Sequence, residues 1–251
     1  GNKLFISTSN GIIAVDLTSF SPGTPGTLPA GSLPYSDLVI DEANGVLYGS
    51  NTAGHKIDVI SIFTLQVVDE IRLQNGASPK GMDLSPDGSE LAVALNGANQ
   101  IAFIDTGSLS VTATVIPEAS DFPFDVKYGR TGRLYSSGSP YSGGFEYIHV
   151  IDTTTHTNVS KSSFIIRAGP SLTISADNNY LFANEQFSPN KLYKFDVTTD
   201  TIPSPTSTQH TSGFTANTYI LLNDETKVFT STGQVWSNPT DLSLSSQLGS
   251  F

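Results

Sequence analysis

A short strand-ending signature recurs along this chain at nearly constant intervals, and this repeat constrains the fold more than any other feature of the sequence. The signature is a large apolar residue followed by Asp or Ser, and it occurs at Val15-Asp16, Ile60-Ser61, Ile104-Asp105, Ile151-Asp152 and Phe195-Asp196. The polar members stand at positions 16, 61, 105, 152 and 196, so the intervals are 45, 44, 47 and 44 residues. Such a steady period indicates that one small structural unit is built several times.

Residues 78–115 show most clearly what one unit contains. Apolar alternation broken by turn-forming residues predicts four strands, at Gly81–Ser85, Glu90–Leu95, Gln100–Asp105 and Ser110–Ile116. A Pro-Asp-Gly turn separates the first two strands, and short turns rich in Gly, Asn and Ser separate the others. Because consecutive strands joined by tight turns pair with each other, the unit is predicted to be a four-stranded antiparallel meander.

A period of about 40 to 45 residues with four strands per unit is typical of β-propellers, whose small sheets bury both faces around a central channel. We therefore expect an all-β fold in which residues 1–251 form a single β-propeller domain of four-stranded antiparallel blades. Six blades are recognisable from their second strands, the first at Lys3–Ile6 and the last at Lys227–Thr230. The inner strand that should precede Lys3 is missing. We therefore expect 1–251 to be a fragment of a longer polypeptide, whose ring has six or seven blades.

One stretch of the chain resembles a known repeat family. Ser78–Val115 is similar to the YVTN-type repeats of surface-layer-like β-propellers, through the SPDG turn at Ser85–Gly88 and the Ile-Asp-Thr element that begins at Ile104. Looser matches follow at Ile151–Val159 and Phe195–Ile202. Because YVTN-type propellers are frequent in surface-layer and other secreted prokaryotic proteins, the resemblance implies an extracellular, cell-surface or periplasmic location.

Charge and composition narrow the classes of partner. Twelve basic residues against 23 acidic ones give a net charge of -11, so the surface should repel phosphate backbones, and nucleic acid is excluded as an expected partner. The sequence contains no run of about 18 apolar residues, and no transmembrane segment is predicted. Without cysteine the chain has no disulfide, thiolate metal site or cysteine nucleophile.

Ligands of propellers usually meet the face that carries the second-to-third and fourth-to-first strand connections. Four polar residues from different blades are candidates for the channel mouth on that face: Asp37, His55, Asp121 and Glu185. An insertion at Gly138–Phe145 adds a candidate contact loop, in which Tyr141 and Phe145 stand on a Gly- and Ser-rich frame. The alternative is that these two aromatic rings cover the adjacent blade.

The sequence predicts no catalytic residue, metal site or cofactor. The four histidines, His55, His149, His156 and His210, lie at different phases of the repeat and lack the local spacing of a metal motif. The strand-ending aspartates recur at one phase, where their oxygens can accept hydrogen bonds from the turn amides that follow. Hydrolase, nucleotide-binding, zinc-protease and calcium-loop motifs are absent, while the sequon at Asn158 leaves glycosylation open.

Two functions compete. The first is a noncatalytic extracellular or cell-envelope propeller that serves as a scaffold or binds a protein or glycan partner in a larger assembly. The second is a propeller enzyme or enzyme subunit, since propellers of similar architecture include lactonases, lyases and quinone- or metal-dependent redox proteins. The second would need acidic, basic or imidazole groups converging at the channel mouth, and the sparse candidates there favour the first.

Overall fold

The computed structural model describes residues 35–119, 121–139, 144–167, 169–185, 191–207 and 246–250, together with the strands at 3–8, 11–16, 21–22, 219–221, 227–230 and 234–237. Within this part of the chain every regular element is a β-strand except one 3-10 helix, η1 (Asn96–Ala98). No helix there is long and apolar enough to cross a membrane. The chain divides into two compact units, Gly1–Thr114 and Val115–Phe251.

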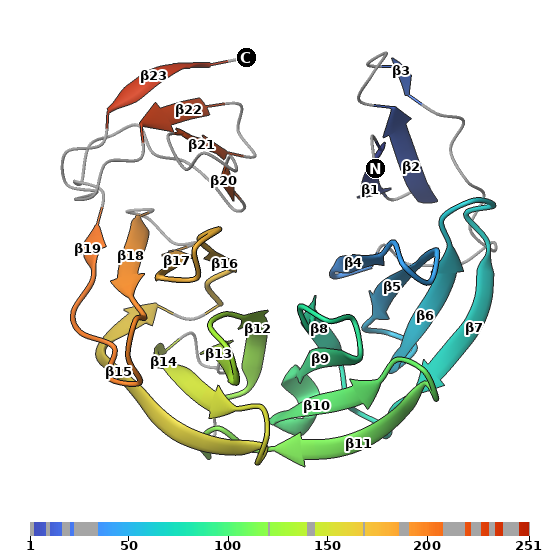
Figure 1. Ribbon diagram of the computed structural model, residues 1–251, viewed down its shortest axis with the longest axis horizontal. Coiled ribbons are helices and arrows are strands. Elements are labelled where there is room, and N and C mark those ends of the chain that lie inside the picture. The colour runs from blue at the N-terminus through green and yellow to red at the C-terminus, as the bar shows by residue number, and fades with distance from the viewer. Residues whose placement is uncertain are drawn as a thin grey trace. The chain divides into compact units, whose positions relative to one another are not determined.

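Each sheet is built from strands that follow one another along the chain (Figure 1). The first unit holds three sheets: β1 (Lys3–Thr8), β2 (Gly11–Asp16) and β3 (Ser21–Pro22); β4 (Leu38–Asp41), β5 (Val46–Asn51), β6 (Lys56–Ser61) and β7 (Val67–Arg72); β8 (Pro79–Leu84), β9 (Glu90–Leu95), β10 (Gln100–Asp105) and β11 (Ser110–Val115). The second unit also holds three sheets: β12 (Pro123–Tyr128), β13 (Arg133–Gly138), β14 (Phe145–Asp152) and β15 (Thr157–Arg167); β16 (Leu172–Ile174), β17 (Tyr180–Asn184), β18 (Leu192–Asp196) and β19 (Thr206–Ser207); β20 (Tyr219–Leu221), β21 (Lys227–Thr230), β22 (Gln234–Ser237) and β23 (Gln247–Ser250).

The predicted repeat unit is confirmed strand by strand. β9 and β10 have the predicted bounds, while β8 begins two residues earlier, at Pro79, and β11 ends at Val115. β8 begins early because Pro79 already pairs with Leu95, before a register shift that brings Met82 opposite Val93. All five strand-ending signatures close a strand, namely β2, β6, β10, β14 and β18.

Strand-ending aspartates hold the turns that follow them, as predicted. The Asp105 carboxylate accepts hydrogen bonds from the amide and hydroxyl of Ser108, both at 2.7 Å. Asp152 and Asp196 accept in the same way from threonines two or three residues downstream. These bonds replace the backbone pairing that the chain loses on leaving the sheet, so the residue type at this phase specifies where each third strand ends.

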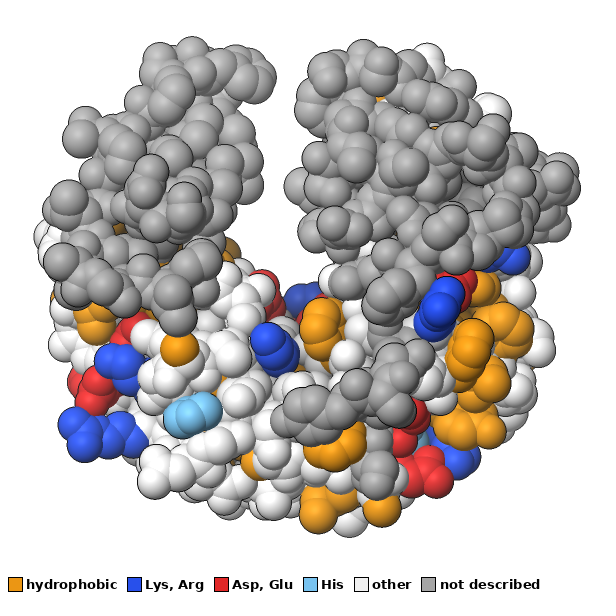
Figure 2. Space-filling view, turned by 180° about the vertical axis from the view of Figure 1, so that it is seen from behind, with side chains coloured by type: hydrophobic (Ala, Val, Ile, Leu, Met, Phe, Trp, Pro, Cys, Tyr) orange, Lys and Arg blue, Asp and Glu red, His pale blue; other side chains and the backbone are white. Residues whose placement is uncertain are grey.

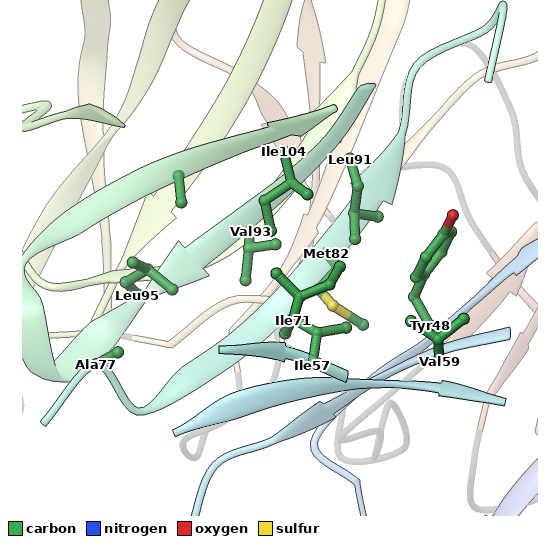
Figure 3. Packing of buried hydrophobic residues seen from close by; sticks show 11 residues of the cluster. Tyr48, Ile57, Val59, Ile71, Ala77, Met82, Leu91, Val93, Leu95 and Ile104 are labelled. Atoms are coloured by element: carbon green, nitrogen blue, oxygen red, sulfur yellow. The ribbon is translucent and has the colours of Figure 1, made fainter. Parts of the chain in front are cut away.

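Neighbouring sheets within each unit pack through strands that are buried on both faces. In the first unit, Met82 of β8 lies among Tyr48, Ile57, Ile71 and Leu91 (Figure 3), which come from the β4–β7 sheet and from β9. A second cluster joins the β12–β15 and β16–β19 sheets. It contains Tyr135, Ile148, Val150, Ile166, Leu172, Leu181, Tyr193 and Phe195. Burying each large aliphatic side chain contributes about 1.5–3 kcal/mol, so these interfaces stabilise each unit strongly.

Two aspartates add a polar link between consecutive sheets. One oxygen of Asp37 accepts the backbone N–H of Met82 at 2.8 Å, and one oxygen of Asp125 accepts that of Leu172 at 2.7 Å. In both cases the other oxygen accepts the amide of the residue that follows the aspartate. Asp37 and Met82 are 45 residues apart in the sequence, and Asp125 and Leu172 are 47 residues apart. In each unit this hydrogen bond fixes the inner strand of one sheet against the inner strand of the next.

Candidate functional site

The connection between β11 and β12 lies along the β14–β15 hairpin. Its backbone and side chains make three contacts with that hairpin. The Asn158 amide donates to the carbonyl of Pro117 at 2.6 Å, and Lys161 donates to Glu118 at 2.7 Å. The third contact joins the carboxylate of Asp121 to the ring of His149. The connection is therefore held on β14 and β15 at several points.

Strand alternation directs His149 away from the apolar cluster of its unit. Its neighbours Ile148 and Val150 belong to that cluster, so the His149 ring projects from the opposite face of β14. The residue is nevertheless only 1% exposed, because the connection covers it. Asp121 is 6% exposed. An imidazole and a carboxylate thus meet where water is largely excluded.

A second carboxylate completes a group of three potential ligands. Glu118, Asp121 and His149 each offer one ligand atom, and these atoms all lie within 4.8 Å of one another. The distance from Glu118 Oε2 to His149 Nε2 is 4.0 Å. Asp121 Oδ2 and His149 Nε2 are buried and in contact, yet neither atom has a hydrogen-bond partner of ordinary geometry. Among the described residues, this is the group of His and acidic side chains with the spacing of an ion site.

Glu146, at the start of β14, joins the cluster through Asp121. Burial, hydrogen bonding to Asp121 and the negative charge of that carboxylate raise the pKa of Glu146 to about 8. Burial works against ionisation of Asp121 as well, but the contacts with His149 and Glu146 outweigh it and hold the pKa of Asp121 below its usual value. The pair therefore shares one proton near neutral pH, with Glu146 protonated and Asp121 ionised.

The structure places the four predicted channel-mouth residues in different roles. Asp121 belongs to the cluster. Asp37 and His55 lie in the other compact unit, where Asp37 links two sheets and the His55 ring accepts the amide of Ser78 at 3.2 Å. Glu185 accepts the phenolic hydroxyl of Tyr193 at 2.9 Å. Three of these four polar groups thus have a contact that organises the local fold.

Of the two aromatic residues of the predicted contact loop, Tyr141 and Phe145, the structure describes one. Tyr141 lies outside the described residues. Phe145 begins β14 and is 57% exposed. The Lys161 ammonium stands 4.1 Å from the centre of the Tyr147 ring, two residues along the same strand. An exposed aromatic side chain therefore lies on the strand that also carries the cluster residue His149.

Sequence reasoning assigned no site role to Glu118, Glu146 or His149. One signal was available at the repeat phase three residues before the end of each third strand. Alongside Ala102, this phase holds Asp58, His149 and Tyr193, all of them buried. Polar residues at a buried phase require a specific partner, and Asp58 has one in the hydroxyl of Tyr35 at 3.0 Å. Sequence alone does not show that the partner of His149 is the β11–β12 connection.

Comparison with known proteins places the fold among the β-propellers. A curated seven-bladed β-propeller protein of Mycobacterium tuberculosis is 30% identical over 104 residues, which cover 41% of this chain and 26% of that protein. The aligned segment thus spans about a quarter of the relative's length. No family model matches the chain.

Two solved structures carry the same fold over nearly the whole chain. A putative 6-phosphogluconolactonase of Bacteroides fragilis aligns with a TM-score of 0.77 at 14% identity, covering 99% of this chain and 80% of that one. The β-propeller domain of Swd1 from Myceliophteria thermophila aligns with a TM-score of 0.75 at 15% identity, covering 99% and 82%. At such low identity these likenesses show the architecture alone: the chain has an all-β fold of four-stranded propeller blades.

Proposed function

We propose that this protein is a noncatalytic β-propeller that acts outside the cell or in the cell envelope, as a scaffold that binds a protein partner within a larger assembly. The observation that carries the proposal is an apolar surface on the β14–β15 hairpin, formed by Phe145, Tyr147 and Ile165 and called here the hairpin surface. Location outside the cell rests on the resemblance of residues 78–115 to YVTN-type repeats.

The register of the hairpin brings these side chains together. Tyr147 pairs with Ile165, and Phe145 pairs with Arg167 next along the ladder, so all four lie on one face of the two strands. Phe145 is 57% exposed and Ile165 is 42% exposed. Exposed aromatic and aliphatic side chains beside an arginine are the composition found at the centres of protein interfaces. Because they stand on paired strands, little conformational entropy is lost when a partner covers them.

The acidic side chains support a noncatalytic role. Recurrent aspartates that could serve as acids or bases, such as Asp87, Asp105 and Asp177, accept hydrogen bonds from nearby turn groups, which lower their pKa. Such carboxylates stay ionised at neutral pH and are poor proton donors. On the face drawn in Figure 2, described acidic and basic side chains lie among uncharged groups, with apolar patches between them. This surface is suited to contact with a protein rather than with a polyanion.

The binding test uses the hairpin surface directly. Phe145→Ser and Ile165→Ser would be combined in one protein. The control is Val111→Ser on the outer strand β11, because the Val111 side chain is as exposed as that of Ile165, at 42%. A partner would be isolated from the secreted and envelope fractions, purified, and titrated against all three proteins. We expect the double variant to lose at least tenfold in affinity, about 1.4 kcal/mol, and the control to lose little. Equal affinity for all three proteins, or binding to a glycan array in place of a protein, would contradict the proposal.

A second candidate function is favoured by one observation, the cluster of Asp121, Glu146 and His149. A protonated carboxyl, a carboxylate and an imidazole together can perform acid–base chemistry, as hydrolysis of a lactone would require. Burial argues against it, because His149 and Asp121 offer almost no surface to a substrate. Lactone turnover by the purified protein that is abolished by His149→Gln would establish this candidate in place of the scaffold.

A further inference from the structure

The buried group formed by Glu118, Asp121 and His149 has the ligand chemistry of a transition-metal site. Two carboxylates and one imidazole suit Zn²⁺ and Mn²⁺, whereas Ca²⁺ and Mg²⁺ prefer oxygen ligands alone. The three residues come from two separate segments, the β11–β12 connection and β14. A bound ion would therefore join parts of the fold that are distant in sequence.

The spacing of the ligand atoms fits a single ion. Bonds from Zn²⁺ to nitrogen or oxygen are about 2.0–2.2 Å long, so two atoms on one ion lie at most about 4.4 Å apart. Glu118 Oε2 and His149 Nε2 are 4.0 Å apart, and Asp121 Oδ2 contacts the same ring nitrogen. The whole group falls within 4.8 Å, so a small rotation of side chains lets all three bind together.

A second observation points to a ligand at this place. His149 Nε2 and Asp121 Oδ2 are buried, with side chains only 2% and 8% exposed, and neither has a hydrogen-bond partner of ordinary geometry. Buried polar atoms are almost always satisfied, and because these two atoms make no hydrogen bond beyond their mutual contact, a shared ion would supply the missing partner. A cation bound by the imidazole nitrogen and the carboxylate oxygen would satisfy both, once the two side chains move apart to about 3 Å, the separation of neighbouring ligands on one ion.

Glu118, the third ligand, makes the site accessible to an ion from solvent. The Glu118 side chain is 46% exposed, so one side of the group faces solvent, and water can complete the coordination shell. Lys161 donates to the same Glu118 oxygen at 2.7 Å and carries a positive charge that repels a cation. Lys161 therefore competes with a metal ion for Glu118, and its removal should strengthen binding.

We propose that Glu118, Asp121 and His149 bind one divalent transition-metal ion of the Zn²⁺ or Mn²⁺ type, which fastens the β11–β12 connection to β14. The site does not depend on the proposed partner or on the hairpin surface. In the bound form His149 coordinates through Nε2, so Nδ1, which lies 3.2 Å from the amide nitrogen of Asn158, carries the ring proton.

The test is calorimetric titration of the 251-residue protein after a chelator has removed bound metal. Separate titrations use ZnCl₂, MnCl₂, MgCl₂ and CaCl₂. We expect one saturable site for Zn²⁺ or Mn²⁺ and none of comparable strength for Mg²⁺ or Ca²⁺. Glu118→Gln keeps the size and exposure of the side chain and should weaken binding by about tenfold or more. Lys161→Met should strengthen it, and Glu42→Gln, an exposed glutamate in the other unit, is the control that should leave it unchanged.

A second variant keeps the test independent of folding. His149→Gln should abolish binding, and its circular dichroism and melting temperature without metal show whether the fold is retained. If the His149→Gln variant does not fold, the binding measured for Glu118→Gln decides the test. The proposal is overturned if the wild-type protein shows no saturable site for Zn²⁺ or Mn²⁺, if Glu118→Gln binds as tightly as wild type, or if Ca²⁺ binds equally well.

Discussion

At the scale of single residues, the acidic side chains of this protein separate into distinct roles. Aspartates at the ends of strands and in tight turns hold local structure, and Asp37 and Asp125 link consecutive sheets. Asp121 alone among the predicted channel-mouth residues lies in a cluster with an imidazole. The difference comes from the partners that the fold supplies, since the residue type is the same in each case.

Replacing Asp37 by Ala tests the link between sheets. The change leaves the amides of Met82 and Leu38 without their acceptor, so we expect a loss of about 1–3 kcal/mol in the free energy of unfolding. Denaturant titration followed by circular dichroism measures it. Asp69→Ala removes an exposed carboxylate from the same unit and should cost much less. A similar loss in both proteins would show that net charge, and not the link, is what matters.

Acid should weaken the turn around Asp87. Hydrogen bonds from the Ser85 hydroxyl and from the amide and hydroxyl of Ser89 lower the pKa of Asp87 to about 2. A carboxyl whose pKa is lower in the folded state contributes stability that is complete above its unfolded pKa, near 4, and is lost as pH falls through the folded value. The difference in stability between wild type and Asp87→Asn should therefore be constant near neutral pH and shrink between about pH 4 and pH 2. A difference that persists unchanged at pH 2 would exclude the ionised carboxylate as its source.

At the scale of elements, the turn and strand chemistry of this sequence was enough to locate the repeat. The bounds of β9 and β10 follow from apolar alternation between clear turns, and each strand-ending aspartate lies where its turn needs an acceptor. β8 was less predictable, because its early start depends on the pairing of Pro79 with Leu95 across a register shift. Tertiary pairing of that kind has no local signature.

The interface between the β4–β7 and β8–β11 sheets should depend on Met82. This fully buried side chain stands between the two sheets, so Met82→Ala leaves a cavity and should lower the free energy of unfolding by about 2–5 kcal/mol. Val111→Ala, on the exposed outer strand β11, provides the control and should cost far less. The same denaturant titration compares them, and equal losses would mean that the two sheets do not rely on this contact.

At the scale of the whole molecule, period and strand count predicted the β-propeller fold, and the alignments confirm it over 99% of the chain. The candidate site was only partly predictable. The place of Asp121 in a fourth-to-first strand connection predicts a position at the channel mouth, whereas the role of His149 appears only when that connection packs on β14. Location outside the cell remains a prediction, which fractionation of the source cells would test.

The central claim, that this propeller binds a protein partner through the hairpin surface, is tested most directly by photo-crosslinking in the source cells. A photoreactive phenylalanine analogue would replace Phe145, and a second protein would carry it at Phe63, which is more exposed, at 82%, and lies in the other unit. We predict one discrete protein adduct from position 145 that is absent from position 63. No adduct from position 145, or the same mixture of adducts from both positions, would contradict the claim.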